Sequence, residues 1–356
     1  MKKLICYALS LTIVCGCSKE SSPPVIPPTI YVAGYTTLIG GNDIPDYWVD
    51  NTSTGSFAAN TAQSDRTLST LALDISANGN DIYIVGSNYN NSTNLNVAVL
   101  WKNGIPTNLS SGNQPSAYAT SVAVTNEHVY VGGATTSLNG LTAQGILWTD
   151  GVMSVLNNPN TSASISDVFV NGSDVYACGV EHSQSSTTFL TFASYWKNQV
   201  RTVLSDTTKV FSSRATSIMV SGTDVYVSGN YTDPSGKTHA AYWKNGALTI
   251  LETNSLGSYS LCIFVTGTDV YVGGGYFANN NQQAVYWKNG VMTTLTNAYK
   301  AEIGSINVNS GNVYASGSIQ STSSSNSIAV MWKNGIKTAL SDSTTTSGVG
   351  RGMFLK

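Results

Sequence analysis

Apolar residues occur in short runs along most of the chain, and turn-forming residues separate these runs. Within residues 215–251 the runs ATSIMV, VYVSG, AAYW and ALTIL are separated by SGTD, by a variable stretch and by KNG. Apolar runs this short, bounded by turn signals, predict β-strands rather than helices. Asn-Gly between two runs predicts a tight hairpin, because both central residues of a type I′ turn need a positive φ. The segment therefore predicts four antiparallel strands.

The same pattern recurs from residue 29 to residue 356. The tryptophans are in register at steps of 44 to 53 residues: Trp48, Trp101, Trp148, Trp196, Trp243, Trp287 and Trp332. A second series, in motifs such as IYVAG and VYVGG, has the same mean step: Tyr31, Tyr83, Tyr130, Tyr176, Tyr226, Tyr271 and Tyr314. A repeat of about 47 residues is typical of a propeller blade. We therefore predict an all-β, seven-bladed β-propeller of four-stranded antiparallel blades, with six or eight blades as alternatives.

The two ends of the repeat array complete each other. The first repeat begins at TIYVAG without a first strand, and the C-terminal segment Gly348–Lys356 aligns with the first strand of another repeat, RATSIMV. We expect this segment to close the ring by adding the missing strand to the first blade. A linear solenoid would instead need polar capping repeats, which the sequence lacks.

The four strands of a repeat differ in character. Strands 2 and 3 are nearly continuous apolar runs, as expected where both faces are buried between neighbouring blades, with the Trp of each repeat filling the space between them. Strand 4 carries Pro106, Arg201 and Lys337, which suits an exposed outer edge.

The N-terminus resembles a bacterial lipoprotein signal. Residues 1–16 contain a basic start and an apolar run too short to cross a bilayer. The following Cys17 is the residue that this resemblance predicts to be acylated, with palmitate among the chains attached. Residues 17–28 are Pro-rich and predict an extended tether. The resemblance implies an outer-membrane lipoprotein, on the cell surface or the periplasmic side; the alternative is an ordinary secreted protein.

Composition and charge exclude some partners. Charged residues make up 10% of the chain and its formal net charge is -2, so it lacks the clustered basic residues of a nucleic-acid-binding protein. We expect a monomer attached to a membrane only through the lipid at Cys17.

The repeat motifs resemble two groups of propellers. Glycine after strand 2 with aromatic residues downstream is distantly similar to kelch and galactose-oxidase-like propellers. The elements YWKNG and DVYV more closely resemble uncharacterised propeller-repeat lipoproteins of Bacteroidetes-type bacteria. These resemblances imply a fold and a location and no activity. The copper ligands of galactose oxidase, two Tyr and two His, have no equivalent here.

The sequence predicts no cofactor and no metal site. His128, His182 and His239 lie in different repeats, without a second His or Cys at ligand spacing. Cys178 and Cys262 are predicted to be buried free thiols. A recurring acid precedes strand 2, and we expect it to bond its own turn backbone rather than calcium: Asp81, Asp174, Asp224 and Asp269.

The connections predict which face carries function. The turns between strands 1 and 2 and between strands 3 and 4 are short and repetitive and share one face, here the short-turn face. The connections from 2 to 3 and from 4 to 1 are long and dissimilar and share the opposite, long-loop face. Function on a repeat scaffold usually resides on its varied face. We therefore predict a binding or interaction module for a neutral, hydroxyl-rich ligand such as a glycan, or for a protein.

The candidate ligand-binding residues lie on the long-loop face. They are Tyr231 and Tyr276, which are among the aromatic residues expected in its loops, and Arg66, Arg214 and Arg351, which are expected near the starts of first strands around the axis. No catalytic motif is present. The alternative function is a glycan-active hydrolase or lyase with carboxylates at the propeller mouth, for which the candidates are Glu181, Asp206, Asp233 and Glu252.

Overall fold

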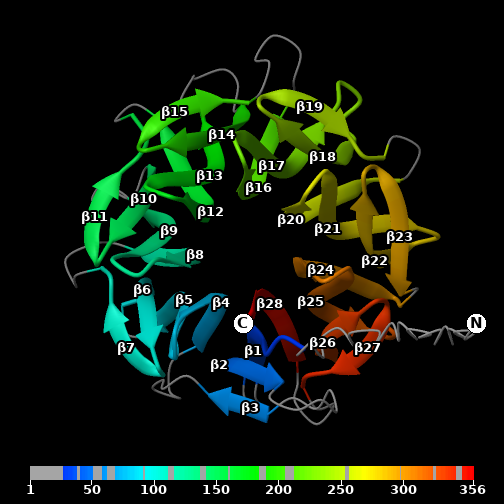
Figure 1. The fold of residues 1–356 in the computed structure, drawn as a ribbon, viewed down its shortest axis with the longest axis horizontal. Helices are drawn as coiled ribbons and strands as arrows, with labels where there is room; N and C mark the ends of the chain where they lie inside the picture. The colour runs from blue at the N-terminus through cyan, green and yellow to red at the C-terminus, as the bar shows by residue number, and fades with distance from the viewer. Residues whose placement is uncertain are drawn as a thin grey trace, which may run out of the picture.

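The chain folds into a closed ring of seven four-stranded antiparallel blades, as the sequence predicts (Figure 1). Blades 6 and 7 are joined into one eight-stranded sheet by a single parallel pairing of Gln282 with Lys300. The structure is a computed structural model. It describes residues 27–37, 41–50, 58–61, 69–90, 93–110, 116–136, 142–158, 161–183, 190–204, 212–252, 256–296, 298–323, 326–341 and 347–356. These residues form strands and turns and contain no helix, so none of them forms a helix that could span a membrane.

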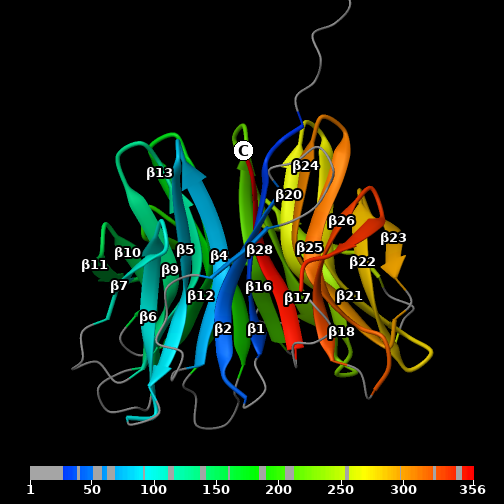
Figure 2. The ribbon, with the colours of Figure 1, turned by 90° about the horizontal axis from the view of Figure 1, so that it is seen from below.

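Each blade has an inner strand beside the axis and a second strand next to it (Figures 1 and 2). From blade 1 to blade 7 the inner strands are β28 (Ser347–Leu355), β4 (Ser69–Asn78), β8 (Ala117–Val124), β12 (Ser162–Asn171), β16 (Ser212–Ser221), β20 (Ser258–Thr266) and β24 (Lys300–Asn309). The second strands are β1 (Ile30–Thr37), β5 (Asp81–Asn90), β9 (Val129–Thr136), β13 (Asp174–His182), β17 (Asp224–Thr232), β21 (Asp269–Ala278) and β25 (Asn312–Gln320).

A third strand and a short outer strand complete each blade. The third strands are β2 (Asp43–Asp50), β6 (Leu95–Lys102), β10 (Ala143–Thr149), β14 (Thr191–Lys197), β18 (Thr238–Lys244), β22 (Asn281–Lys288) and β26 (Ser327–Lys333). The outer strands are β3 (Ala58–Thr61), β7 (Ile105–Asn108), β11 (Val152–Val155), β15 (Val200–Val203), β19 (Ala247–Ile250), β23 (Val291–Thr296) and β27 (Ile336–Ala339). Strands β7, β15 and β19 are exposed along their whole length, as expected of an outer edge.

The C-terminal strand closes the ring, which confirms the sequence prediction. β28 pairs with β1 antiparallel, from Ile30 opposite Leu355 to Thr37 opposite Ser347. The backbones of Thr29 and Lys356 extend this pairing with two reciprocal hydrogen bonds of 2.9 Å. Blade 1 is therefore built from both ends of the repeat array.

The tryptophans fill the space between blades, as predicted. All seven are at most 2% exposed. Each packs against the preceding blade: Trp243 of blade 5 lies in a cluster with Tyr176 and Cys178 of blade 4, and Trp332 lies with Tyr271 of blade 6. Burial of such large rings gives each interface between blades much of its apolar contact area.

The Lys-Asn-Gly turn clamps two hairpins of a blade together. In blade 2, Asn103 has a φ of 52°; its Nδ2 donates to Asp81 at 2.7 Å, and its Oδ1 accepts from the backbone N–H of Ile82 at 2.8 Å. Lys102 Nζ lies 2.8 Å from Asp81 and 5.3 Å from the ring centroid of Tyr83. The clamp recurs at Lys197, Asn198 and Asp174, at Lys244, Asn245 and Asp224, and at Lys288, Asn289 and Asp269.

This clamp corrects the expectation for the recurring acid. It bonds the Lys and Asn of the neighbouring turn instead of its own turn backbone, because both short turns of a blade meet on the short-turn face. In blade 3 the pair is His128 and Asp150, with 2.7 Å between Nδ1 and Oδ2. Polar groups on this face therefore serve the same structural purpose in successive blades.

Candidate functional site

A ring of seven side chains, one from each inner strand, surrounds the axis near the long-loop face. We call it the mouth ring; its members are Val349, Leu71, Tyr118, Ser164, Arg214, Tyr259 and Glu302, from blade 1 to blade 7. Each is the second or third residue of its strand. Each also pairs with the residue that follows a glycine of the second strand, as Arg214 does with Asn230 and Tyr118 with Ala134. The repeat therefore places seven side chains, of six residue types, at one level.

The recurring second-strand glycine fixes this level. A Cβ at Gly229 would lie 2.0 Å from the carbonyl oxygen of Arg214, and a Cβ at Gly133 would lie 2.1 Å from that of Tyr118. The same close approach recurs at the equivalent glycines of the other blades. Any residue with a Cβ would clash with the carbonyl oxygen of the inner strand at this position. This explains the glycine of the VYVSG and VYVGG motifs.

A register shift follows the mouth ring in every inner strand, as between Ala215 and Ser217 of β16. The inserted residue forms a β-bulge, a feature that re-aims side chains and is common beside functional sites. In β28 the inserted residue is Arg351, and in β16 it is Thr216.

Blades 3 to 5 give the mouth ring a positive side. Arg214 is exposed, and Tyr118 is 36% exposed. Partial burial raises the pKa of Tyr118, and the Ser164 hydroxyl and the charge of Arg214 oppose this rise. Burial and then the charge of Arg214 lower the pKa of His182, which ends β13. The positive charge of Arg214 thus acts on side chains of blades 3 and 4.

Blades 6, 7 and 1 form a neutralised side. Arg351 donates from Nη1 to Glu302 Oε1 at 3.2 Å, and the Tyr259 hydroxyl donates to Glu302 Oε2 at 2.9 Å. Gln282 donates to the same tyrosine oxygen. Burial, followed by the charge of Glu302, raises the pKa of Tyr259. The carboxylate of Glu302 thus neutralises the positive charge of Arg351.

Two carboxyls lie one level deeper, where they join neighbouring blades. Asp167 of blade 4 accepts hydrogen bonds from Ser121 of blade 3 and from Ser217 of blade 5, each at 2.7 Å. Asp74 of blade 2 accepts from the backbone N–H of Val122 in blade 3 at 2.9 Å. Burial, with the charge of Asp167, raises the pKa of Asp74 to about 7, and burial also raises the pKa of Asp167.

A cavity of about 400 Å³ occupies the axis at and below this level. Its lining includes the two aspartates and, further from the mouth, apolar side chains such as Phe169 and Met219. The two carboxyls were missed by the sequence analysis. In the described part of the chain no three His, Cys, Asp or Glu side chains form a group that could hold a metal ion.

The predicted tyrosines lie on strand ends rather than in loops. Tyr231 is the last residue but one of β17 and stacks on His239, with 6.3 Å between ring centroids. Tyr276 lies at the equivalent position of β21 and packs partly buried against the core between blades 5 and 6. Of the predicted arginines, Arg214 belongs to the mouth ring and Arg351 lies at the bulge just below it. Arg66 and Cys17 are outside the described residues.

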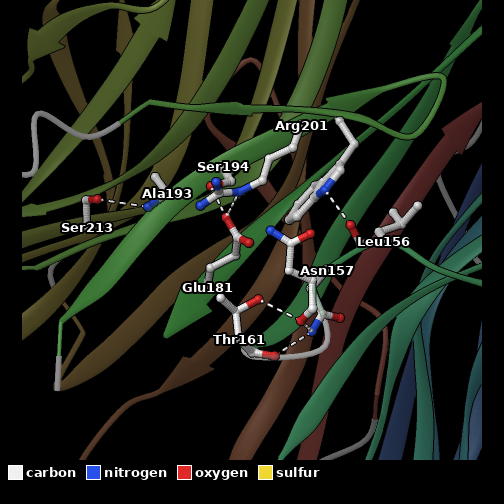
Figure 3. A network of polar contacts seen from close by, with 10 residues as sticks. Leu156, Asn157, Thr161, Glu181, Ala193, Ser194, Arg201 and Ser213 are labelled. Atoms are coloured by element: carbon white, nitrogen blue, oxygen red, sulfur yellow. Dashed lines mark hydrogen bonds and ion pairs between the residues drawn. The ribbon is translucent and has the colours of Figure 1, made fainter. Parts of the chain in front are cut away.

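The four predicted carboxylates do not form one site among the described residues. Glu181 lies in β13 at 1% exposure, where Ser194 donates to it at 2.6 Å and Arg201 pairs with it (Figure 3). Ser235 and His239 hold the pKa of Asp233 well below its usual range.

The remaining two predicted carboxylates are Glu252 and Asp206. Glu252 is partly buried next to His239, which bonds the Glu252 backbone oxygen at 2.8 Å, and Asp206 is outside the described residues. The sequence placed Glu181 in a loop because the pattern alone does not show that β13 extends to His182.

Comparisons with known proteins show the fold. No family model matches the chain, and no curated protein matches it in sequence. The β-propeller domain of the Trilobed protease from Pyrococcus furiosus is similar, with a TM-score of 0.54 and 10% identity over 88% of this chain and 92% of that one. That domain has an open velcro topology, whereas β28 closes the ring here.

A puromycin-hydrolyzing peptidase from Mycobacterium tuberculosis is also similar, with a TM-score of 0.53 and 8% identity over 88% of this chain and 53% of the peptidase. At such low identities the likeness extends to the propeller fold alone.

Proposed function

We propose that the protein is a lipid-anchored β-propeller of the cell envelope that acts as a binding or interaction module through its long-loop face. The observation that carries the proposal is the difference between the two faces. On the short-turn face, the same Lys, Asn and Asp clamp recurs in blades 2, 4, 5 and 6, and a His and Asp pair takes its place in blade 3. At the mouth ring, one backbone position carries six residue types in seven blades. A position whose backbone is fixed and whose side chain varies is suited to recognition.

The proposed lipid anchor agrees with the direction of the first strand. β1 begins at Ile30 on the short-turn face, where Thr29 pairs with Lys356. A chain that continues from there to an acylated Cys17 would hold the short-turn face toward the outer membrane and the long-loop face away from it. Two or three acyl chains are enough for stable attachment.

The anchor is tested by phase partitioning of the expressed full-length protein. The wild type should enter the detergent phase and Cys17→Ala should stay in the aqueous phase, whereas Cys178→Ala, which changes a buried thiol, should partition like the wild type. Equal partitioning of wild type and Cys17→Ala would refute the anchor.

The binding face is tested with a panel of glycans and surface proteins. We expect at least one ligand whose binding weakens in Tyr231→Ala and Tyr276→Ala and remains in Lys337→Gln, which changes an exposed residue of the outer strand β27. No ligand across a broad panel, or a ligand equally sensitive to Lys337→Gln, would contradict a long-loop binding module.

A glycan-active hydrolase is the second candidate. The observation that favours it is a carboxyl with a pKa of about 7, that of Asp74, in an axial cavity with a second carboxyl. Turnover of a bound glycan that disappears in both Asp74→Asn and Asp167→Asn, with binding retained, would establish the enzyme. Binding without turnover in the wild type would establish the module.

A further inference from the structure

Arg214 has an exposed positive charge with no ion-pair partner among the residues that the structure describes. Among the described residues, the other two arginines are ion-paired, Arg201 with Glu181 and Arg351 with Glu302. Arg214 has no such pair within the described ranges. Because β16 holds it at the mouth ring through the close approach to Gly229, its location is set by rigid backbone rather than by a loop.

The surroundings of Arg214 combine a flat ring with hydroxyl groups. Tyr118 and Ser164 occupy the mouth-ring positions of the two preceding blades, and the charge of Arg214 acts on both Tyr118 and His182. The strands involved pack directly: β12 contacts both β8 and β16. A guanidinium beside a partly exposed phenol ring and a hydroxyl can bind a carboxylate and the apolar face of a sugar ring together.

The levels below the ring restrict an anion to the mouth. Asp74 and Asp167 line the axial cavity one level deeper, and the ionised form of either carboxyl would repel a negative group that moved further in. On the far side of the ring, Glu302 and Arg351 neutralise each other. The positive field at the mouth therefore comes from the side of blades 3 to 5.

We propose that Arg214, Tyr118 and Ser164 form a subsite for the carboxylate of an acidic sugar, a uronic acid residue of a glycan. The inference rests on the proposed long-loop binding module and names its ligand class. The guanidinium binds the carboxylate with two parallel N–H···O hydrogen bonds, for which its planar fork is suited. The Tyr118 ring supports the sugar. An acidic peptide is the alternative ligand, and poly-glutamate represents it in the test.

The test is calorimetric titration of the full-length protein with tetragalacturonate and with its methyl ester, which keeps the sugar rings and removes the charge. We expect the affinity for the ester to be at least about tenfold lower than that for the acid, because the charge-assisted hydrogen bonds are lost. Arg214→Gln should lose a similar factor for the acid and little for the ester. Arg214→Lys should fall between, and Tyr118→Ala should weaken both ligands.

The control is Lys337→Gln, which removes the same charge at the outer edge and should leave affinity unchanged. Equal affinity for acid and ester, no effect of Arg214→Gln in a protein of unchanged melting temperature, or tighter binding of poly-glutamate would overturn the acidic-sugar subsite. Binding of a neutral panel ligand that depends on Tyr231 and Tyr276 but not on Arg214 would overturn the subsite and leave the long-loop binding module standing. Absence of any long-loop ligand would overturn both.

Discussion

Gly229 lies against the backbone of Arg214 so closely that a Cβ at Gly229 would stand 2.0 Å from the Arg214 carbonyl oxygen. The contact links the repeat signature to the candidate site. The glycine allows the inner strand to bulge, and the bulge follows the residue that the strand presents at the mouth ring.

Gly229→Ala should therefore destabilise the protein by about 2–4 kcal/mol, because the added methyl group forces β16 away from β17. Chemical denaturation measures the change. Gly246→Asn is the matched control: Gly246 has a φ of 85° with open space around it, and Asn tolerates that conformation. A loss no larger at Gly229 than at Gly246 would show that the inner strand is not held in this way.

Trp243→Ala should cost about 3–5 kcal/mol, because it removes a fully buried ring from the interface between blades 4 and 5. Leu248→Ala on the outer strand β19, where Leu248 is 40% exposed, should cost much less. Denaturation midpoints of the two variants measure the difference. Similar midpoints would argue against tight packing between the blades.

Deletion of residues 348–356 should abolish cooperative folding of the ring. The deletion leaves the edge of β1 unpaired from Ile30 to Thr36, and each buried backbone group without a partner costs about 1–3 kcal/mol. Thermal melting followed by circular dichroism measures the effect. A melting temperature within a few degrees of the wild type would mean that β28 is dispensable.

Asp74→Asn should make stability less dependent on pH. Burial and the charge of Asp167 raise the pKa of Asp74 to about 7, above the value of about 3.9 in an unfolded chain. The protonated carboxyl therefore favours the fold below about pH 4, and this contribution is lost as the pH rises through about 7. The free energy of unfolding of Asp74→Asn relative to the wild type should rise by about 2–3 kcal/mol between pH 5 and pH 8.

The control for this pH dependence is Asp81→Asn. Lys102 and Asn103 lower the pKa of Asp81, so neither its folded nor its unfolded value lies between pH 5 and pH 8 and the difference from wild type should stay constant. Denaturation series at both pH values make the comparison. If the difference in free energy of unfolding between Asp74→Asn and the wild type were also the same at pH 5 and pH 8, Asp74 would titrate as an exposed carboxyl.

The strand order could be predicted because its signals are local. Trp and Tyr recur at one spacing, Asn-Gly marks the hairpins, and an incomplete first repeat matches an extra final strand. The axial carboxyls could not be predicted in this way. Asp74 and Asp167 lie in first strands whose mixed polarity resembles that of the other repeats, and their partners Val122 and Ser217 are 48 and 50 residues away.

The level of the mouth ring also had no sequence signal. It depends on a β-bulge in each inner strand and on the contact of a carbonyl oxygen with a glycine, and neither appears in hydrophobic periodicity. Arg214 and Arg351 were both predicted near the axis, but the sequence did not distinguish the exposed guanidinium from the one that Glu302 neutralises. That difference arises from side chains of neighbouring blades.

The central claim, that the long-loop face around the mouth ring binds the ligand, is tested most directly by amide hydrogen exchange with and without the panel ligand that binds. We predict added protection in the N-terminal parts of inner strands, above all around Tyr118 and Arg214, and none in the short turns that contain Asn103 and Asn245. Protection confined to those short turns, or spread evenly over both faces, would contradict the account.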